Sequence, residues 1–451
     1  MSRQQKLVLA ISILASFVAF LDSSVVNVAL PAISRNLGGG LATQQWVVDA
    51  YLITLGSLIL LAGSLSDLFG RKRILVWGLI GFAVTSILCA AALDSTFLVI
   101  GRALQGIAGA LLVPSSLALI ISSFSGASQA KAIGTWTAWT GISFIVGPLL
   151  GGFLVDVFSW RLIFAINILP IAVCLWLLRL LEQPEQTKRV KLDVVGAVLC
   201  SLGLSGSVFA LIEQPHYGWD SIIIRSSLIL GVLMIVSFIW YENKMTNAML
   251  PLSLFSIRNF WVGNIATVAI YGGLSIATFL IVIFLQQVSG YSALDAGLAL
   301  LPVTIVMFLL SPRFGALAGK YGPRFFMAVG PIVAGSGFLM MRLITVHVSY
   351  WTQLFPGVLI FALGLSMTVA PLTSAVLGSI EPKHAGIASA VNNAISRIAG
   401  LIAIALVGLI AGTHLNIGGF RRAITVTAGM IIIGGIVSAI GISNRKRTAP
   451  A

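Results

Sequence analysis

The sequence predicts an all-α membrane protein: two six-helix bundles with two extra helices between them, fourteen transmembrane helices in total. Three observations support this. Of the 451 residues, 58% are hydrophobic and only 9% are charged, whereas soluble domains carry about 25% charged residues. Apolar runs long enough to cross a bilayer, which takes about 20 residues, recur along the whole chain. Lys and Arg collect in alternate loops between these runs, as they do in membrane proteins.

Charged or Pro/Gly-rich breaks divide the apolar residues into fourteen expected spans. The basic N-terminus, Met1 to Lys6, leads into an apolar run without a small-residue cleavage site, so this run is expected to stay as the first span. The expected spans are 7–30, 45–66, 74–93, 96–121, 131–157, 160–181, 193–213, 221–241, 260–288, 293–318, 324–344, 351–378, 385–412 and 420–441.

The basic residues predict the orientation of the chain. Seventeen Lys and Arg lie in the segments on the side of the N-terminus, and four, Arg35, Arg161, Arg421 and Arg422, lie in the loops on the other side. Cytoplasmic loops are enriched in basic residues. We therefore expect a multi-pass protein of the cell membrane with both termini in the cytoplasm.

Two polar breaks suggest the domain boundaries. We expect an N-terminal bundle over 1–181, a cytoplasmic connector with two extra helices over 182–259, a C-terminal bundle over 260–441 and a cytoplasmic tail over 442–451. Residues 314–324 repeat the spacing of the turn at 63–73, with Gly319 in the place of Asp67. Such internal repeats are typical of secondary transporters.

Asp22 is an ionisable residue inside the first apolar run. An ionised Asp at the centre of a membrane helix costs roughly 2.5–3.5 kcal/mol on insertion scales. Burial favours the neutral carboxyl, and a nearby arginine or water favours the charged one. Asp22 is therefore predicted to carry a proton, the alternative being an Asp that only holds a neighbouring helix by hydrogen bonds.

Arg102 and Gln105 share one face of the fourth span with two glycines. At about 1.5 Å per residue, Arg102 and Asp22 lie at similar depths, so an ion pair between them is expected. Asp49, in the first turns of the second span, has a comparable depth and is a candidate second proton site that competes for Arg102. The alternative for Asp49 is a water-exposed residue at a helix start.

Two further motifs contain closely spaced glycines. Gly63, Asp67, Gly70, Arg71 and Lys72 form a tight cytoplasmic turn, in which Arg71 and Lys72 would face the anionic leaflet. In the fifth span, Gly147, Pro148, Gly151 and Gly152 combine a small-xxx-small face with a helix-loosening proline, which favours close and adjustable helix packing. Ordinary helix packing is the alternative for this second motif.

Polar and aromatic residues within the spans are candidates for a substrate cavity. Trp136 and Trp139 either line such a cavity or belong to the interfacial aromatic belt. Arg397 is accompanied by Asn392 and Ser396 and has no acidic residue at comparable depth in the later spans. The expected cavity residues are Asn27, Gln105, Trp136, Trp139, Tyr271, Asn393 and Arg397.

Several function classes are disfavoured. The net charge is +14, but its basic residues lie mostly in alternate loops rather than in one patch, so nucleic acid is not an expected partner. Cys89, Cys174 and Cys200 lie in apolar runs at no metal-like spacing, and the four His residues share no spacing. No metal or cofactor is expected, and no nucleophile–base–acid set suggests an enzyme.

In these motifs the sequence resembles the major facilitator superfamily, and within it the fourteen-span drug:proton antiporters. The matching stretches are Leu21–Pro31, Gly63–Lys72, the Gly-Arg-x-x-Gln-Gly of Gly101–Gly106, and the Gly-Pro-x-x-Gly-Gly of Gly147–Gly152. Three positions depart from the family pattern: Leu68 where Arg is frequent, Ser143 where the antiporter motif begins with Gly, and the charged Asp49.

The resemblance implies export of amphiphilic drugs or toxic small molecules, driven by a proton gradient. It implies proton handling by Asp22 and Arg102, a conformational latch at Asp67 and Arg71, and an antiporter hinge at Gly147–Gly152. Protons, membrane lipids and a small amphiphilic substrate are the expected partners of a monomer. The alternatives are a dedicated exporter of one metabolite or lipid and a receptor or scaffold without transport.

Overall fold

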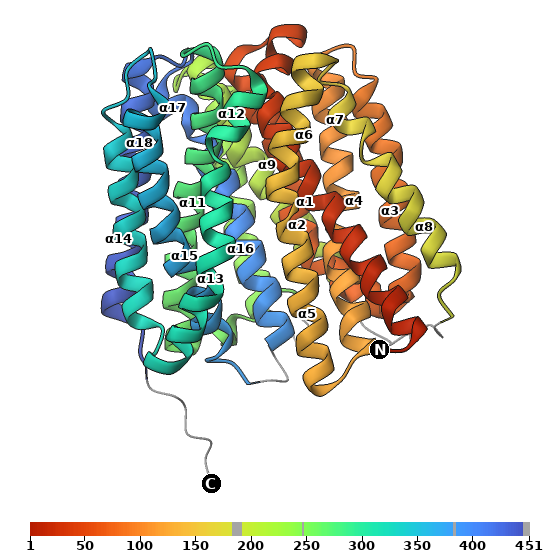
Figure 1. Cartoon of the computed structure of the whole chain (residues 1–451). Helices are drawn as coiled ribbons and strands as arrows, with labels where there is room; N and C mark the ends of the chain where they lie inside the picture. The colour runs from red at the N-terminus through yellow and green to blue at the C-terminus, as the bar shows by residue number, and fades with distance from the viewer. Residues whose placement is uncertain (183–191, 246–247, 382–384, 445–451) are drawn as a thin grey trace. The chain divides into compact units, whose positions relative to one another are not determined.

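The computed structural model describes residues 1–182, 192–245, 248–381 and 385–444. These residues form helices and connecting turns, with no strand among them (Figure 1). Part of the expected connector, 183–191, and the expected tail from 445 onward lie outside the described residues.

The first ten helices run from the N-terminus to the second polar break. They are α1 (Arg3–Leu37), α2 (Gly40–Phe69), α3 (Arg71–Ala90), α4 (Ser95–Ser123), α5 (Gly126–Gly141), α6 (Ser143–Val157), α7 (Leu162–Ala165), α8 (Ile168–Arg179), α9 (Val194–Tyr217) and α10 (Ile222–Lys244).

The rest of the chain adds eight α-helices, a 3-10 helix and a π-helix. They are η1 (Leu252–Ser256), α11 (Arg258–Gln287), α12 (Ala293–Ala299), α13 (Leu301–Tyr321), α14 (Arg324–Met341), η2 (Tyr350–Leu354), α15 (Phe355–Leu377), α16 (Ala385–Ala405), α17 (Val407–Ala411) and α18 (Ile417–Gly441).

Within the described part of the chain, 14 helical segments are long and apolar enough to cross a membrane, which confirms the predicted number. Four of the predicted spans contain a break. The fifth is interrupted at Ile142, the sixth at Ile166 and Asn167, the tenth at Leu300 and the thirteenth at Leu406. Hydropathy detects the length of an apolar run but not a local change of helix geometry, so these breaks are visible only in the structure.

The helices group into two units. Unit 1 comprises Met1–Ala210, Trp219–Met249 and Ser292–Gly297, and unit 2 comprises Leu211–Gly218, Leu250–Tyr291 and Leu298–Ala451. Of the two extra helices, α10 and most of α9 therefore belong to unit 1. The hydroxyl of Ser201 on α9 lies 2.8 Å from that of Ser57 on α2, which ties α9 to this unit.

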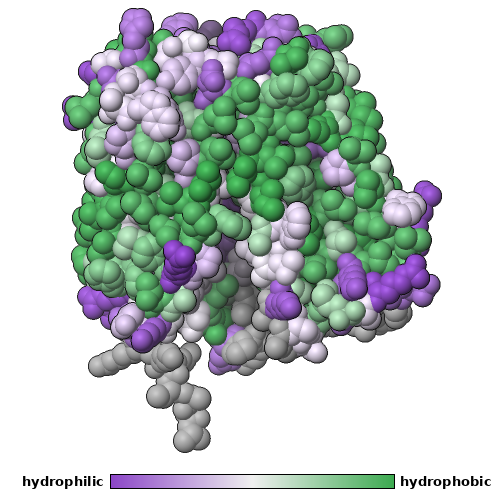
Figure 2. Space-filling view, viewed as in Figure 1, coloured by the Kyte–Doolittle hydropathy of each residue, from purple (hydrophilic) through white to green (hydrophobic). Residues whose placement is uncertain are grey.

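Helix α3 shows how the apolar residues divide between core and lipid. Leu79 and Phe82 are fully buried in the core of unit 1, whereas Trp77, Val84 and Ile87 are about half exposed. In a soluble protein such an exposed apolar stripe would be unfavourable, but in a bilayer it faces the acyl chains. Figure 2 shows the same pattern on the visible face, where hydrophobic residues predominate and hydrophilic ones gather at both ends.

Two tight turns confirm the internal repeat. Gly70 joins α2 to α3 with φ 97° and ψ 134°, and Gly322 joins α13 to α14 with φ 91° and ψ 153°. Residues with a side chain rarely adopt this positive φ, so both turns require glycine. The repeated spacing around 63–73 and 314–324 thus corresponds to one backbone geometry used twice.

Candidate functional site

Asp22 lies in the interior of unit 1, where its side chain is 0% exposed. Arg102 Nη1 donates to Asp22 Oδ2 at 2.6 Å, so the predicted ion pair is present. Gln105 Nε2 and Asn167 Nδ2 donate to Oδ1 at 3.1 Å and 3.0 Å. Both oxygens of this buried carboxylate are therefore hydrogen-bonded, and one of them faces a full positive charge.

Arg102 is held in place by groups other than Asp22. Its Nε donates to the carbonyl oxygen of Val47 at 3.0 Å, and its Nη1 also donates to Gln105 Oε1 at 2.6 Å. The guanidinium carbon lies 4.3 Å from the ring centroid of Tyr51, a cation–π contact. The guanidinium therefore keeps several contacts whatever the protonation state of Asp22.

The close approach of α2 and α4 brings Arg102 to these partners. Asp94 caps α4 by accepting a hydrogen bond from the backbone of Phe97 at 2.8 Å, which fixes where the helix begins. One turn after Arg102, a Cβ on Gly106 would lie 2.3 Å from the carbonyl oxygen of Tyr51. Only glycine permits this separation, so the Gly-Arg-x-x-Gln-Gly motif sets the distance between the two helices.

Two members of the site, Ser86 and Asn167, do not follow from the sequence analysis. The Ser86 hydroxyl accepts hydrogen bonds from Gln105 at 2.9 Å and from Asn167 at 3.3 Å. Asn167 occupies the break between α7 and α8, and its Oδ1 is buried without a hydrogen-bond partner. The sequence feature that could have identified Asn167 is that it is a single amide within the apolar run 160–181.

Asp49 lies in the third turn of α2 and is fully buried. Neither of its carboxylate oxygens has a hydrogen-bond partner in the structure. Asp49 therefore accepts no hydrogen bond from Arg102, and the expected competition with Asp22 for this arginine is not seen in the structure. The alternative of a water-exposed residue at the helix start is wrong, because the side chain is 0% exposed.

The glycines of the predicted hinge pack against α1 immediately after Asp22. A Cβ on Gly147 would lie 1.8 Å from Ser24 Oγ, and one on Gly151 would lie 2.7 Å from Val25 Cγ2. The Ser24 hydroxyl donates to the carbonyl oxygen of Ser143 at 3.1 Å. Helix α6 therefore lies directly on the turn of α1 that follows the carboxylate.

The other two hinge residues have different surroundings. Pro148 lies inside α6 without ending it, and the break that precedes this helix falls at Ile142. A Cβ on Gly152 would lie 2.5 Å from the Cα of Leu294, which is in the Ser292–Gly297 segment of unit 1. Three of the four residues of this motif are thus glycines at positions where a Cβ would overlap a neighbouring helix or segment.

The predicted latch lies at the turn between α2 and α3. Arg71 Nη2 lies 3.5 Å from Asp67 Oδ1, and both side chains are partly exposed. Lys72 Nζ donates to the carbonyl oxygen of Leu181 at 2.7 Å, so the turn is also tied to the chain just after α8. Gly63 has open space around the position of a Cβ, and nothing in unit 1 explains why it is glycine.

The cavity residues predicted for unit 1 have different environments. Gln105 is buried in the network around Asp22 and does not present a free surface. Trp136 is partly buried, and its indole donates to Ser16 Oγ at 3.0 Å. Trp139 is 54% exposed and Asn27 is half-buried. Gln105 and Trp136 are thus engaged in hydrogen bonds within unit 1, and Trp139 is the most exposed of the four residues.

In unit 2 the predicted cavity residues lie on α11 and α16. Arg397 on α16 is close enough to Tyr271 on α11 to interact with it electrostatically, so a phenol rather than a carboxylate is the neighbour identified for this arginine. Asn393 is exposed. Its neighbour Asn392 donates to Asn264 Oδ1 at 2.9 Å, which joins α16 to α11.

Comparison with known proteins identifies the relatives of this fold. The family model described as Major Facilitator Superfamily matches residues 12–404. The methylenomycin A resistance protein of Bacillus subtilis (strain 168) is 34% identical over 421 residues, which is 91% of this chain and 88% of that protein. The puromycin resistance protein pur8 of Streptomyces alboniger is 30% identical over 468 residues, covering 98% and 92%.

A third relative and the solved structures agree with these matches. The multidrug resistance protein Stp of Mycobacterium tuberculosis (strain ATCC 25618 / H37Rv) is 34% identical over 428 residues, 92% of this chain and 78% of that protein. A crystal structure of a bacterial homologue of the human lysosomal transporter Spinster has a TM-score of 0.71 at 15% identity, covering 98% of this chain and 97% of that one. At this identity the likeness concerns the fold.

The ion pair between Asp22 and Arg102 leads to a prediction about stability. Arg102→Gln should destabilise the protein by about 3 kcal/mol or more, because it leaves a buried carboxylate without its counter-charge. Asp22→Asn combined with Arg102→Gln should cost at least about 1 kcal/mol less than the sum of the single changes, because the unpaired charge is gone. Thermal unfolding of the purified variants in detergent measures both effects.

The exposed pair Asp220 and Arg225 provides the matched control. Asp220→Asn and Arg225→Gln should each have little effect, because solvent screens a surface pair. Strictly additive losses at Asp22 and Arg102 would contradict a coupled buried pair.

Proposed function

The chain belongs to the Major Facilitator Superfamily and is a multi-pass transporter of the cell membrane, and from this premise we propose that it exports amphiphilic drugs or toxic small molecules in exchange for protons. The names of its relatives support export of toxic compounds. Methylenomycin A resistance, puromycin resistance and multidrug resistance proteins each match about nine-tenths or more of the chain.

The buried pair of Asp22 and Arg102 is the observation that carries proton coupling. In the charged state, the carboxylate accepts three hydrogen bonds, one of them from the guanidinium at 2.6 Å. Protonation of Asp22 cancels the attraction between the two side chains, while Arg102 keeps its bonds to Val47 and Gln105. A proton therefore loosens α1 from α4 without displacing the arginine.

The contact between α1 and α6 extends this effect to the hinge motif. Ser24 and Val25, which touch Gly147 and Gly151, follow Asp22 by two and three residues on the same helix. Any shift of α1 on protonation must therefore move the surface on which α6 packs. We propose that this contact links the proton to the exchange between inward-open and outward-open states.

The turn between α2 and α3 is proposed to act as a latch. A partly exposed ion pair such as Asp67 and Arg71, at 3.5 Å, contributes little stability, about 0–1 kcal/mol. A contact of this strength can form and break in each transport cycle. Lys72 donates to the carbonyl oxygen of Leu181, just after α8, and this bond would keep the turn in place while the ion pair is broken.

Substrate contacts are proposed separately for each unit. In unit 1, Asn27 and Trp139 offer an amide and an exposed aromatic surface. In unit 2, Tyr271, Asn393 and Arg397 offer a phenol, an amide and a cation. This mixture of aromatic and hydrogen-bonding groups suits amphiphilic compounds better than strictly ionic ones.

A dedicated exporter of a single compound is the second candidate. Some relatives are named for one compound, among them the probable actinorhodin transporter of Streptomyces coelicolor. Transport of a chemically diverse panel of dyes and antibiotics into inverted membrane vesicles favours the multidrug function. Export of a single member of the panel favours the dedicated one.

Asp22→Asn should abolish proton-coupled efflux, because Asn keeps the size and the polarity but cannot bind and release a proton. In proteoliposomes, substrate-dependent proton release should fall to the background, while substrate binding remains. Asp94→Asn is the control, since this exposed cap of α4 keeps its capping ability as Asn. Uphill export by Asp22→Asn at half the normal rate or more would contradict the proposed coupling.

Gly147→Leu should reduce efflux at least about tenfold, because a side chain here would overlap Ser24 and push α6 away from α1. The measurement is the initial rate of export, normalised to the amount of folded protein in the membrane. Gly141→Leu is the matched control, since a Cβ at Gly141 has no neighbour within 4 Å. Equal rates for the two variants would remove the hinge motif from the mechanism.

Asp49 is proposed as a second proton site, because a fully buried carboxyl without a hydrogen-bond partner is best accommodated in its neutral form. Asp49→Asn should then lower the number of protons released per exported molecule and change the pH dependence of export, measured from about pH 6 to pH 8, because Asn cannot bind a proton. If export and proton release match the unmodified protein over this range, Asp22 acts alone.

A further inference from the structure

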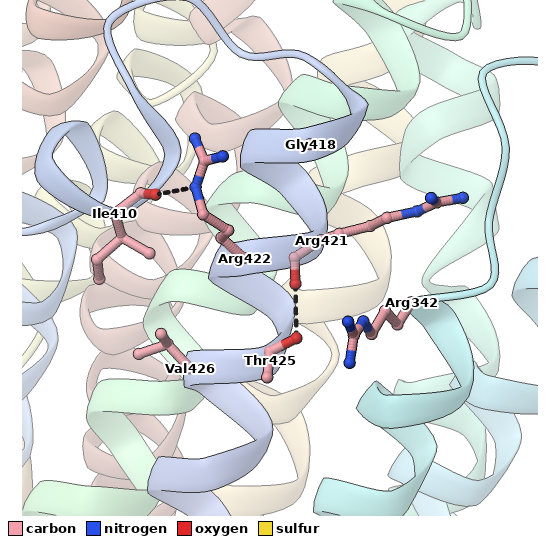
Figure 3. A pocket seen from close by; sticks show the side chains of 7 residues that line it. All are labelled: Arg342, Ile410, Gly418, Arg421, Arg422, Thr425 and Val426. Carbon is pink, nitrogen blue, oxygen red and sulfur yellow. Dashed lines mark hydrogen bonds between the residues drawn. The ribbon is translucent and has the colours of Figure 1, made fainter.

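Unit 2 contains a hollow of about 700 Å³ beside the first turns of α18. This volume lies within the range of about 300–1,000 Å³ that is usual for small-molecule sites. Three of its seven lining residues are arginines. The lining consists of Arg342, Ile410, Gly418, Arg421, Arg422, Thr425 and Val426 (Figure 3).

The arginines come from two elements and are partly fixed by the backbone. Arg421 and Arg422 are neighbours on α18, and Arg342 directly follows the last residue of α14. Arg421 Nη2 donates to the carbonyl oxygen of Ile344 at 3.1 Å, and Arg422 Nε donates to that of Ile410 at 3.1 Å. Figure 3 shows the side chains of Arg342 and Arg421 on the same side of α18, with Arg422 on the other.

No acidic residue balances these charges from within the lining. The sequence from Leu298 to Ala451, which supplies all seven lining residues, contains a single acidic residue, Glu381, and it lies beyond the last turn of α15. Like charges gathered in one place repel each other. An anion from outside this stretch of chain would relieve that repulsion.

The position along the helices places the arginines at a membrane interface. Arg421 is the fifth residue of α18, about 6 Å along the axis from its start at 1.5 Å per residue. The predicted topology assigns this end of the helix to the outside, where basic residues are normally scarce. Ile410 and Val426 add apolar surface to the same hollow. An anionic group with an attached apolar part fits this combination.

We propose that this hollow binds a phosphate-type anion through Arg342 and Arg421. Guanidinium groups present paired donors that match phosphate oxygens, and Arg422 adds positive charge on the other side of α18. Two sources share this chemistry: the headgroup of an anionic phospholipid, whose acyl chain would lie along the apolar wall, and free phosphate. The site is independent of Asp22 and its network, all of which lie in unit 1.

The test measures phospholipid retained by the purified full-length protein with native mass spectrometry. The protein is incubated with phosphatidylglycerol or with phosphatidylcholine, each with and without inorganic phosphate. Unmodified protein should retain phosphatidylglycerol preferentially. Arg342→Gln combined with Arg421→Gln should weaken that retention about thirtyfold, which corresponds to about 1 kcal/mol for each arginine near a membrane surface.

Arg225→Gln is the matched control, because it also removes an arginine near the start of a membrane helix, α10, but one that is already paired with Asp220. Its retention should equal that of the unmodified protein. The single variant Arg342→Gln changes an exposed residue and is therefore expected to fold normally. It should weaken lipid retention about fivefold, which separates loss of binding from misfolding.

Selective retention of phosphatidylglycerol identifies a lipid site. Binding of phosphate alone, lost in the double variant, identifies a site for the free anion, and either result supports the proposal. Equal binding of both lipids and of phosphate by the double variant and the unmodified protein would overturn it.

Discussion

The burial of one carboxylate beside one guanidinium is the constraint on which unit 1 depends. Removing either charge from water costs several kcal/mol, and the mutual attraction repays this only when the geometry is good and the remaining polar atoms are satisfied. Here the two groups are 2.6 Å apart, and the side-chain amides of Gln105 and Asn167 donate hydrogen bonds to the other oxygen of the carboxylate. Helices α1, α4 and the α7–α8 break must therefore keep their positions while Asp22 is charged.

The same arrangement explains why protonation can have a mechanical effect. Neutralising Asp22 removes the principal electrostatic attraction between α1 and α4 but leaves Arg102 bound to the α2 backbone. The affected segment of α1 is also the surface that accepts the glycines of α6. A local change of charge thus acts on a packed helix contact, and packed contacts respond by switching between arrangements rather than by gradual deformation.

The two units differ in their ionisable groups, and this suggests a division of roles. Unit 1 holds both buried aspartates, Asp22 and Asp49. The stretch that forms most of unit 2 has Glu381 as its only acidic residue and contributes three arginines to one hollow, whose lining includes no acidic residue. The carboxylates on which the proposed proton coupling relies therefore lie in unit 1, and the arginines of the proposed anion site lie in unit 2.

The sequence by itself determined the class of protein, the fourteen spans and the depth of Asp22 and Arg102, because hydropathy and helical rise are properties of short stretches of chain. The tertiary structure confirmed the expected pairing of Asp22 with Arg102 and decided the other contacts of the site. Asp22 joins Arg102 and Asn167 across separations of 80 and 145 residues, Gln105 is enclosed rather than free, and Asp49 is buried without a hydrogen-bond partner. Such contacts depend on how helices rotate and how closely they approach one another. At Gly106 and Gly147 the helices approach closely because glycine has no side chain to collide with Tyr51 and Ser24.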